Sequence, residues 1–323
     1  MTVRRISVKG FRFAVAAAAC AALAVPAVVH VVSTSTVSTS PSPDKQQTPE
    51  PTPQEKSLLY TAGQLLLRDC MGKRGFEYFP VKENPVPEAR EFRYVLTDLT
   101  WAQKHGYGSD IQRELAKVRE TDPNQRYFHS LPAKRRAVAL TAVNGSDPLS
   151  VTAKAPDGVV LRRSAQGCQS EVYRTLYGDL EAWFQATVTD DALAELRYSR
   201  VTADPRFAEA VKPWSTCMRT AGHPYASPTK LREALRPSQR PLPREEEIEI
   251  AVAEARCAND SGLARTTRAL DRQYAQNLLK QYHSAVDTRR RLQLAALQRA
   301  RSIVGISATE SRLQPQREEK HEK

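Results

Sequence analysis

The sequence predicts a mainly α-helical protein: an irregular helical domain with a long C-terminal helix, few short strands and two disulfides. After residue 57, apolar residues recur through most of the chain at the three- and four-residue spacing of an amphipathic helix. Residues that typically start helices precede many of these stretches, and glycines follow several of them. The same region holds four cysteines, two of them in matching surroundings.

The N-terminal segment indicates export. Its first residues, MTVRRISVKGFRF, are basic, and an almost uncharged apolar stretch follows as far as Val32. A basic start before an apolar run is typical of a secretory signal. The run is also long enough for a membrane span, and Ala17, Ala18 and Ala19 precede Cys20, as small residues precede a lipidated cysteine. Residues 1–32 are therefore predicted to be a signal peptide or an N-terminal anchor, with cleavage, retention and lipidation all open.

The amino-acid composition divides the rest of the chain into a linker, a folded domain and a tail. Residues 33–56 are dominated by serine, threonine and proline, which cannot bury a core, so we expect a disordered linker. Residues 57–304 are predicted to form the disulfide-stapled helical domain, in two related halves of about 57–200 and 204–304. Residues 305–323 are charged and unpatterned, and we expect a disordered tail there.

The first half begins with helices separated by a proline-rich segment. In order, we expect a helix from Ser57 to just before Gly75, an extended segment over 76–96, a short helix capped near Thr97 or Asp98, and a helix from Ser130 to Asn144–Gly145. Gly75 suits the left-handed position after a helix because it has no Cβ.

Further elements follow from turn and capping signals. We expect a hairpin around Asp157–Gly158, a helix from about Gln166 that is interrupted near Val188–Thr189, a helix from Asp204–Pro205 to Gly222, and a short helix capped by Ser227. The Asp–Pro and Ser–Pro pairs each combine a capping side chain with a proline that fits the first helical turn.

Residues 244–302 are helical in pattern almost throughout, with Gly262 as the expected break. An unbroken helix of that length would span about 85 Å. Since this exceeds a compact domain of this size, the distal half must fold back, project into solvent or bind a partner.

A nine-residue pattern occurs twice. CMGKRGFEY begins at Cys70 and CMRTAGHPY at Cys217, so Cys, Met, Gly and Tyr recur at matching offsets. One further cysteine follows each copy, at Cys168 and Cys257. Four cysteines in an exported chain predict two disulfides, for which three pairings are possible. The repeat favours Cys70–Cys168 and Cys217–Cys257, with the methionines packing against neighbours such as Trp214.

These paired motifs, together with GC before a helix, LYGD and WSTCM, resemble a group of secreted actinomycete proteins without an established activity. The resemblance covers roughly residues 57–300. It implies export, helices and disulfides, and it supplies no catalytic residue.

Common catalytic motifs are absent from the sequence: there is no G-x-S-x-G, H-E-x-x-H, P-loop or G-x-G-x-x-G pattern. Ser227 and Lys230 match S-x-x-K, but a capping role is favoured for Ser227. The histidines are dispersed, and only His283 has a carboxylate at helical spacing, Asp287, in what we expect to be an exposed pair. No cofactor or metal is expected, and whether the protein is an enzyme stays open.

The chain carries a formal net charge of +12. Outside the membrane, such a surface favours an anionic envelope polymer, a lipid surface or an acidic protein partner. No nucleic-acid-binding signature is present, so nucleic acid is not expected. The sequence therefore predicts an extracytoplasmic, non-catalytic protein that binds or supports the cell envelope. The alternative is a hydrolase acting on cell-wall material.

The candidate binding residues lie on the last predicted helix: Arg289, Arg290, Arg291, Arg299 and Arg301. A basic amphipathic helix can pack on a core, lie on a membrane or bind a partner. Little chain remains after this helix to cover its apolar face. We therefore expect residues 287–303 to project from the stapled core and to bind an acidic partner or an anionic envelope surface.

Overall fold

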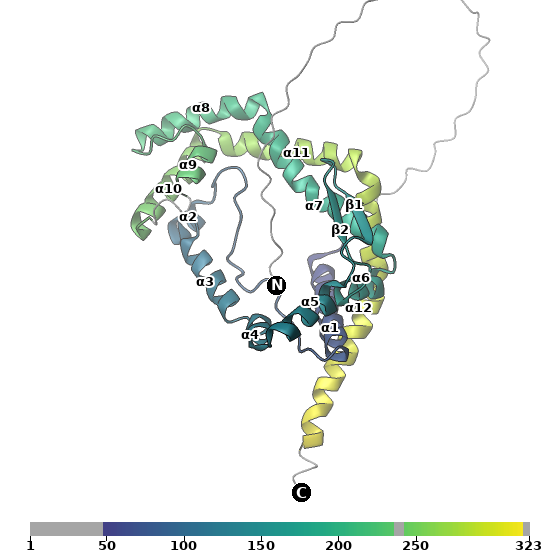
Figure 1. Cartoon of the computed structure of the whole chain (residues 1–323). Helices are drawn as coiled ribbons and strands as arrows, with labels where there is room; N and C mark the ends of the chain where they lie inside the picture. The colour runs from purple at the N-terminus through teal and green to yellow at the C-terminus, as the bar shows by residue number, and fades with distance from the viewer. Residues whose placement is uncertain (1–47, 236–241, 319–323) are drawn as a thin grey trace, which may run out of the picture. The chain divides into compact units, whose positions relative to one another are not determined.

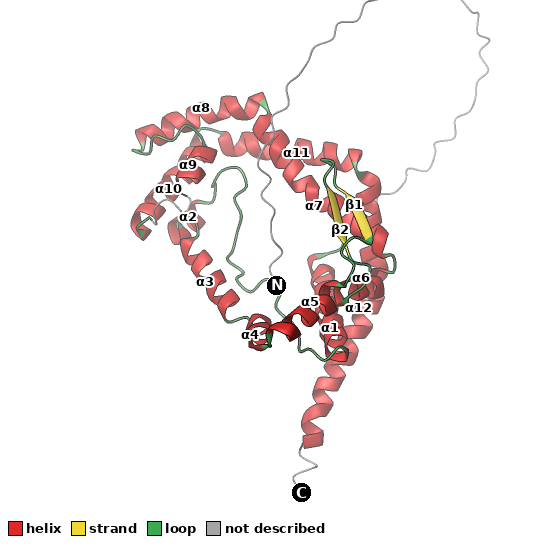
Figure 2. Ribbon diagram, viewed as in Figure 1, coloured by secondary structure: helices red, strands yellow, loops and turns green. Residues whose placement is uncertain are grey.

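The computed structural model describes residues 48–235 and 242–318, with side chains as far as Ser307. The predicted signal or anchor (1–32) and most of the predicted linker (33–56) lie outside the described residues. Helices dominate the described part, and a single hairpin supplies its strands (Figure 2). In chain order the elements are α1 (Pro53–Lys73), α2 (Leu99–His105), α3 (Ser109–Glu120), α4 (Pro123–Ser130), α5 (Ala133–Asn144), β1 (Val151–Lys154), β2 (Val160–Arg163), α6 (Cys168–Tyr177), α7 (Leu180–Ala203), α8 (Pro205–Thr220), α9 (Pro228–Ala234), α10 (Arg244–Asp260), α11 (Leu263–Gln281) and α12 (His283–Glu318).

Helix α1 begins earlier than predicted. The Thr52 hydroxyl accepts a hydrogen bond from the Glu55 N–H at 3.2 Å, and the Glu55 carboxylate accepts one from the Thr52 N–H at 2.8 Å. This reciprocal capping box, with Pro53 in the first helical turn, starts the helix inside the predicted linker. Ser57 is therefore an interior residue of α1. At the other end, Gly75 has φ 76°, as its predicted position after the helix requires.

Helices α3 and α4 occupy a stretch where no helix was predicted. Helix α3 packs one apolar stripe, Ile111, Leu115 and Val118, into a cluster, although only Ile111 is fully buried. Helix α4 buries no residue fully. Helix α2, in contrast, starts as predicted after Asp98, whose carboxylate accepts a hydrogen bond from the Trp101 N–H at 2.9 Å.

Helix α5 ends at Asn144 as predicted, but Ser130 does not cap it. The Ser130 hydroxyl instead donates to the Tyr127 carbonyl at 2.7 Å, at the end of α4, and Pro132 is the capping residue of α5. The predicted hairpin is present: β1 and β2 pair antiparallel, with Lys154 opposite Val160.

The predicted interruption near Val188–Thr189 is wrong, because α7 runs through it without a break. The Thr189 hydroxyl donates to the Gln185 carbonyl at 2.9 Å, so this β-branched residue is accommodated inside the helix. The break lies earlier. Gly178 adopts φ 81°, and the Asp179 carboxylate accepts from the Ala182 N–H at 2.9 Å and caps α7.

The later boundaries follow the predictions more closely. Asp204 caps α8 through the Arg206 N–H at 2.8 Å, and Gly262, with φ 83°, separates α10 from α11. A second break, at Tyr282, was not predicted, because tyrosine carries no terminating signal. Helix α12 then extends to Glu318, so part of the expected disordered tail is helical.

Both disulfides join the pairs that the repeated motif favours. The Cα atoms are 5.7 Å apart in Cys70–Cys168 and 5.6 Å apart in Cys217–Cys257. The first bond ties the end of α1 to the start of α6, and the second ties α8 to α10. Two disulfides agree with an oxidising environment outside the cytoplasm.

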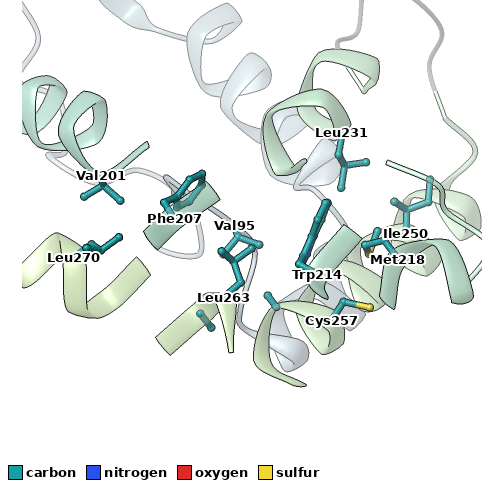
Figure 3. Packing of buried hydrophobic residues seen from close by; sticks show 12 residues of the cluster. Val95, Val201, Phe207, Trp214, Met218, Leu231, Ile250, Cys257, Leu263 and Leu270 are labelled. Atoms are coloured by element: carbon teal, nitrogen blue, oxygen red, sulfur yellow. The ribbon is translucent and has the colours of Figure 1, made fainter. Parts of the chain in front are cut away.

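The methionine of the second motif has the packing role that was predicted for it. Met218 and Trp214 lie about one turn apart on α8, and neither has exposed surface. Figure 3 shows both residues in one apolar cluster with Cys257 and with Val95 from the extended segment.

The two predicted halves of the domain contact each other. Helix α1 packs on α12, as Figure 1 shows, and α2 packs on α10. Val95 from the first half lies in the same apolar cluster as Trp214 from the second. The described residues belong to one compact unit. The repeated cysteine motif therefore marks two similar helix ends in one compact unit, with each disulfide in its own apolar cluster.

Candidate functional site

The predicted binding arginines lie on α12, but this helix does not project from the core. Ala296 and Ala300 have no exposed surface, and Leu297 is 6% exposed. Helix α12 packs on α1, α6 and α7. Its apolar face is covered by helices that precede it in the chain, which the sequence pattern did not reveal. The prediction of a projecting arm over residues 287–303 is therefore wrong.

The five arginines divide into two groups. Arg291 and Arg301 are exposed and form no hydrogen bond or ion pair with a distant segment of the described chain, and Arg299 is exposed but does. The others hold neighbouring segments: Arg289 forms an ion pair with Asp190, Arg290 donates to the Thr48 carbonyl at 3.2 Å, and Arg299 donates to the Leu176 carbonyl at 2.9 Å.

Arg289 and Arg290 line a cleft of about 560 Å³. Its walls come from α1, α7, α11 and α12, from the end of α6, and from the segments around Glu50 and Glu83. This volume falls within the usual range of small-molecule sites. We refer to this space as the aromatic cleft.

Three aromatic residues form part of the wall of the aromatic cleft: Tyr60, Tyr177 and Trp183. The rings of Tyr177 and Trp183 are stacked, with centroids 3.5 Å apart and planes at 9°. The turn at Gly178 and Asp179 brings these residues, from successive helices, against each other. Burial raises the pKa of Tyr177 to about 12, so its hydroxyl stays neutral at physiological pH.

Acidic and basic groups balance around the aromatic cleft. The carboxylates of Glu50, Glu83 and Asp190 face the cations of Lys56, Arg289 and Arg290. The Lys56 hydrogen bond, with the charges of Lys56 and Arg290, holds the pKa of Glu50 below its usual value despite partial burial. The cleft therefore offers many polar groups of both signs but little excess charge.

A second cleft, of about 300 Å³, shares Leu59, Tyr60 and Tyr177 with the first. Tyr78 and Tyr173 also line it. The Tyr78 hydroxyl donates to the Gln64 side chain at 2.9 Å, and burial raises its pKa to about 12. Because the two clefts share wall residues, they are neighbours, with tyrosines lining both of them.

A buried polar cluster joins α2 to α10, and it includes a histidine–carboxylate pair that was not predicted. His105 Nδ1 lies 2.8 Å from Asp110 Oδ2, across the glycine turn between α2 and α3. The Ser109 hydroxyl donates to Glu247, not to His105, so these residues do not form a Ser–His–Asp triad. His283, in contrast, lies 3.1 Å from the Lys280 carbonyl, and the expected surface pair with Asp287 is not formed.

Glu254, in the same cluster, has no exposed surface. It accepts hydrogen bonds from the Tyr107 hydroxyl at 2.7 Å and from the Leu96 N–H at 3.2 Å. Burial raises the pKa of this carboxyl, although these hydrogen bonds and the charge of Arg232 oppose the shift. The cluster is best explained as a structural link between helices, because its groups mainly hydrogen-bond one another; Asp110 Oδ1 is buried without a partner among the described residues.

We expect Glu254→Gln to change how stability depends on pH. In the wild type, the unfolded chain ionises Glu254 near its ordinary pKa of 4.5, while the folded chain retains the proton to higher pH. This group therefore costs stability as pH rises from about 4.5 to the raised folded pKa. The difference in unfolding free energy, variant minus wild type, should rise over that window. Urea unfolding at a series of pH values measures it, and parallel curves would contradict the assignment.

Ser227 is placed as a helix cap, as predicted. Its hydroxyl accepts from the Lys230 N–H at 3.2 Å, and the Lys230 ammonium lies 2.8 Å from Glu233. The lysine is therefore paired elsewhere and is not directed at the serine.

Within the described residues, no group of histidines, cysteines and carboxylates could hold a metal ion, and no helix is long and apolar enough to cross a membrane. No family model matches the chain, and neither a curated protein nor a solved structure is detectably similar to it.

Two residues of the aromatic cleft, Arg289 and Arg290, were predicted to bind a ligand, but as part of a projecting basic helix. Tyr60, Tyr177 and Trp183 were not predicted. A usable signal was present, since LYGD places a glycine and a capping aspartate between the two stacked rings.

Proposed function

We propose that the protein is an extracytoplasmic, non-catalytic binding protein of the cell envelope, and that the aromatic cleft takes a wall glycan. The observation that carries this proposal is the joint presence of tyrosine and tryptophan rings and balanced polar groups in the aromatic cleft, beside a second cleft lined by tyrosines. The face of an aromatic ring carries partial negative charge, which suits the C–H face of a sugar ring. The surrounding carboxylates, amides and guanidinium groups can exchange hydrogen bonds with sugar hydroxyls.

The neutral balance of charge supports a hydroxyl-rich ligand over a strongly anionic one at this cleft. Export is supported by the basic and apolar N-terminal sequence and by the two disulfides. A chain that is secreted or anchored on the outer face of the cytoplasmic membrane would meet wall glycan directly.

The alternative is a hydrolase of cell-wall material, because carboxylates such as those of the cleft can act as general acid and base. A general acid of that kind requires a raised pKa. Glu50 has a lowered pKa, and Asp190 is held in an ion pair with Arg289. These pairings favour binding over acid–base chemistry.

Cosedimentation of the purified full chain with insoluble peptidoglycan tests the proposal. Tyr60→Ala should weaken binding by about tenfold or more, as for a ring at the centre of an interface. Tyr60 is the preferred position because it is only partly buried and makes no part of the stacked pair. Phe79→Ala is the matched control, since Phe79 is 38% exposed and lines neither cleft.

Equal binding by wild type and Tyr60→Ala would overturn the glycan site. Release of soluble sugar from the wall material, abolished by Glu83→Gln, would replace it with the hydrolase.

A further inference from the structure

A second concave site lies on the part of the molecule built by α7, α11 and the extended segment before α2. This pocket of about 370 Å³ is lined by four arginines: Arg93, Arg197, Arg268 and Arg272. It shares no lining residue with the aromatic cleft. Only two carboxylates, Glu91 and Asp271, accompany the arginines, so the pocket has an excess of positive charge.

Two of the four arginines are held in place by the fold. Arg93 donates to the Ala194 carbonyl at 2.6 Å, which fixes its side chain against α7 but leaves its charge uncompensated. Arg197 Nε lies 3.0 Å from Asp271, and the Tyr94 hydroxyl donates to the same carboxylate at 2.6 Å. Asp271 thus contacts Arg197 and Tyr94, and it forms no ion pair with the other arginines of the pocket.

The other two arginines are available to a ligand. Arg268 and Arg272 lie one turn apart on α11, so both side chains can reach the same face of the helix. Both are exposed, and neither has a hydrogen-bond or ion-pair partner among the described residues. Exposed like charges at this spacing repel each other, which costs stability unless an anion lies between them.

We propose that this arginine pocket binds a phosphate group. A guanidinium group presents parallel N–H donors that match two phosphate oxygens. Arg268 and Arg272, beside the fixed charge of Arg93, therefore offer three positive groups to one phosphate. The pocket is concave and holds a phosphate with its attached alcohol or sugar, which favours a phosphate-bearing molecule or polymer over the flat surface of a bilayer.

Calorimetric titration of the purified full chain with inorganic pyrophosphate at low ionic strength tests the proposal. Wild type should bind, and Arg268→Ala/Arg272→Ala should weaken binding by at least about tenfold. Arg268→Lys/Arg272→Lys should also weaken it, because lysine keeps the charge but lacks the forked donors. Neither substitution removes an internal contact, so the far-UV spectrum and melting temperature should change little.

Arg219→Ala/Arg256→Ala is the matched control, because these two arginines are also exposed and their loss changes the net charge equally. An equal loss of affinity in this control would mean that only diffuse charge attracts the anion, and the pocket would be rejected. No binding by wild type, or full binding by Arg268→Ala/Arg272→Ala, would also reject it.

The source of the phosphate is tested by a second arm. Vesicles of phosphatidylglycerol and phosphatidylcholine in equal parts are offered to the same variants. We expect pyrophosphate to compete with any vesicle binding that depends on Arg268 and Arg272. Pocket-dependent binding to vesicles without any binding of soluble pyrophosphate would overturn the proposal in favour of a membrane surface.

Discussion

Replacement of both Cys70 and Cys168 by alanine should lower the unfolding free energy by about 4–5 kcal/mol. The two cysteines are separated by 98 positions, so the bond removes a large amount of chain entropy from the unfolded state. Cys168 has no exposed surface, and the bond lies in an apolar cluster that joins α1, α5 and α6. Urea unfolding followed by circular dichroism measures the change. Because this loss approaches the whole stability of an ordinary domain, partial unfolding at 37 °C is the expected phenotype.

The second disulfide provides an internal comparison. Cys217 and Cys257 are 40 positions apart, so their replacement by alanine should cost somewhat less, about 4 kcal/mol. A loss below about 1 kcal/mol for either double variant would show that the bond adds little beyond the surrounding packing.

The fold class could be predicted because local signals agreed with the final structure. Capping residues such as Asp98, Asp204 and Ser227 each start a helix where their side chains accept a backbone N–H. Gly75 and Gly262 each take a left-handed conformation at a helix boundary. These signals operate within a few residues of chain and are therefore readable from sequence.

Boundaries that depend on tertiary contacts could not be predicted in this way. Tyr282 ends α11 without any residue that marks a stop, and Thr189 continues α7 although it is β-branched. The starting point of α1 was missed for a different reason, since proline and threonine in the linker concealed a complete capping box at Thr52.

The candidate sites could be predicted even less, because each is assembled from distant segments. The aromatic cleft combines Tyr60 from α1, Trp183 from α7 and Arg289 from α12. The arginine pocket combines Arg93 from the extended segment with Arg268 and Arg272 from α11. The spacing of these residues in the sequence does not predict that they lie close together in the fold. The net charge of +12 favours anionic partners, and this stays a prediction.

The packing of α12 has the largest consequence for stability. Deletion of the chain after Thr288 removes Ala296, Leu297 and Ala300, which are buried against α1 and α6. It also uncovers Leu59 and Leu176, which are at most 3% exposed in the intact protein. Each large apolar side chain that loses its burial costs about 1.5–3 kcal/mol, so the sum approaches the full stability of a domain. The truncated chain should show no cooperative thermal transition for the part that contains α1 and α6.

A milder substitution keeps this prediction testable if the truncated chain cannot be purified. Leu297→Ala should lower the unfolding free energy by about 2–5 kcal/mol, because it opens a cavity between α12 and its neighbours. Arg291→Ala is the matched control on the same helix, since Arg291 is exposed and its loss should change stability by less than about 0.5 kcal/mol. Equal melting temperatures for wild type and Leu297→Ala would contradict the packing of α12. They would support the projecting arm that the basic, leucine-rich sequence predicts. A large loss confined to Leu297→Ala would instead show that α12 packs on the core, as the burial of Leu297 against α1 and α6 requires.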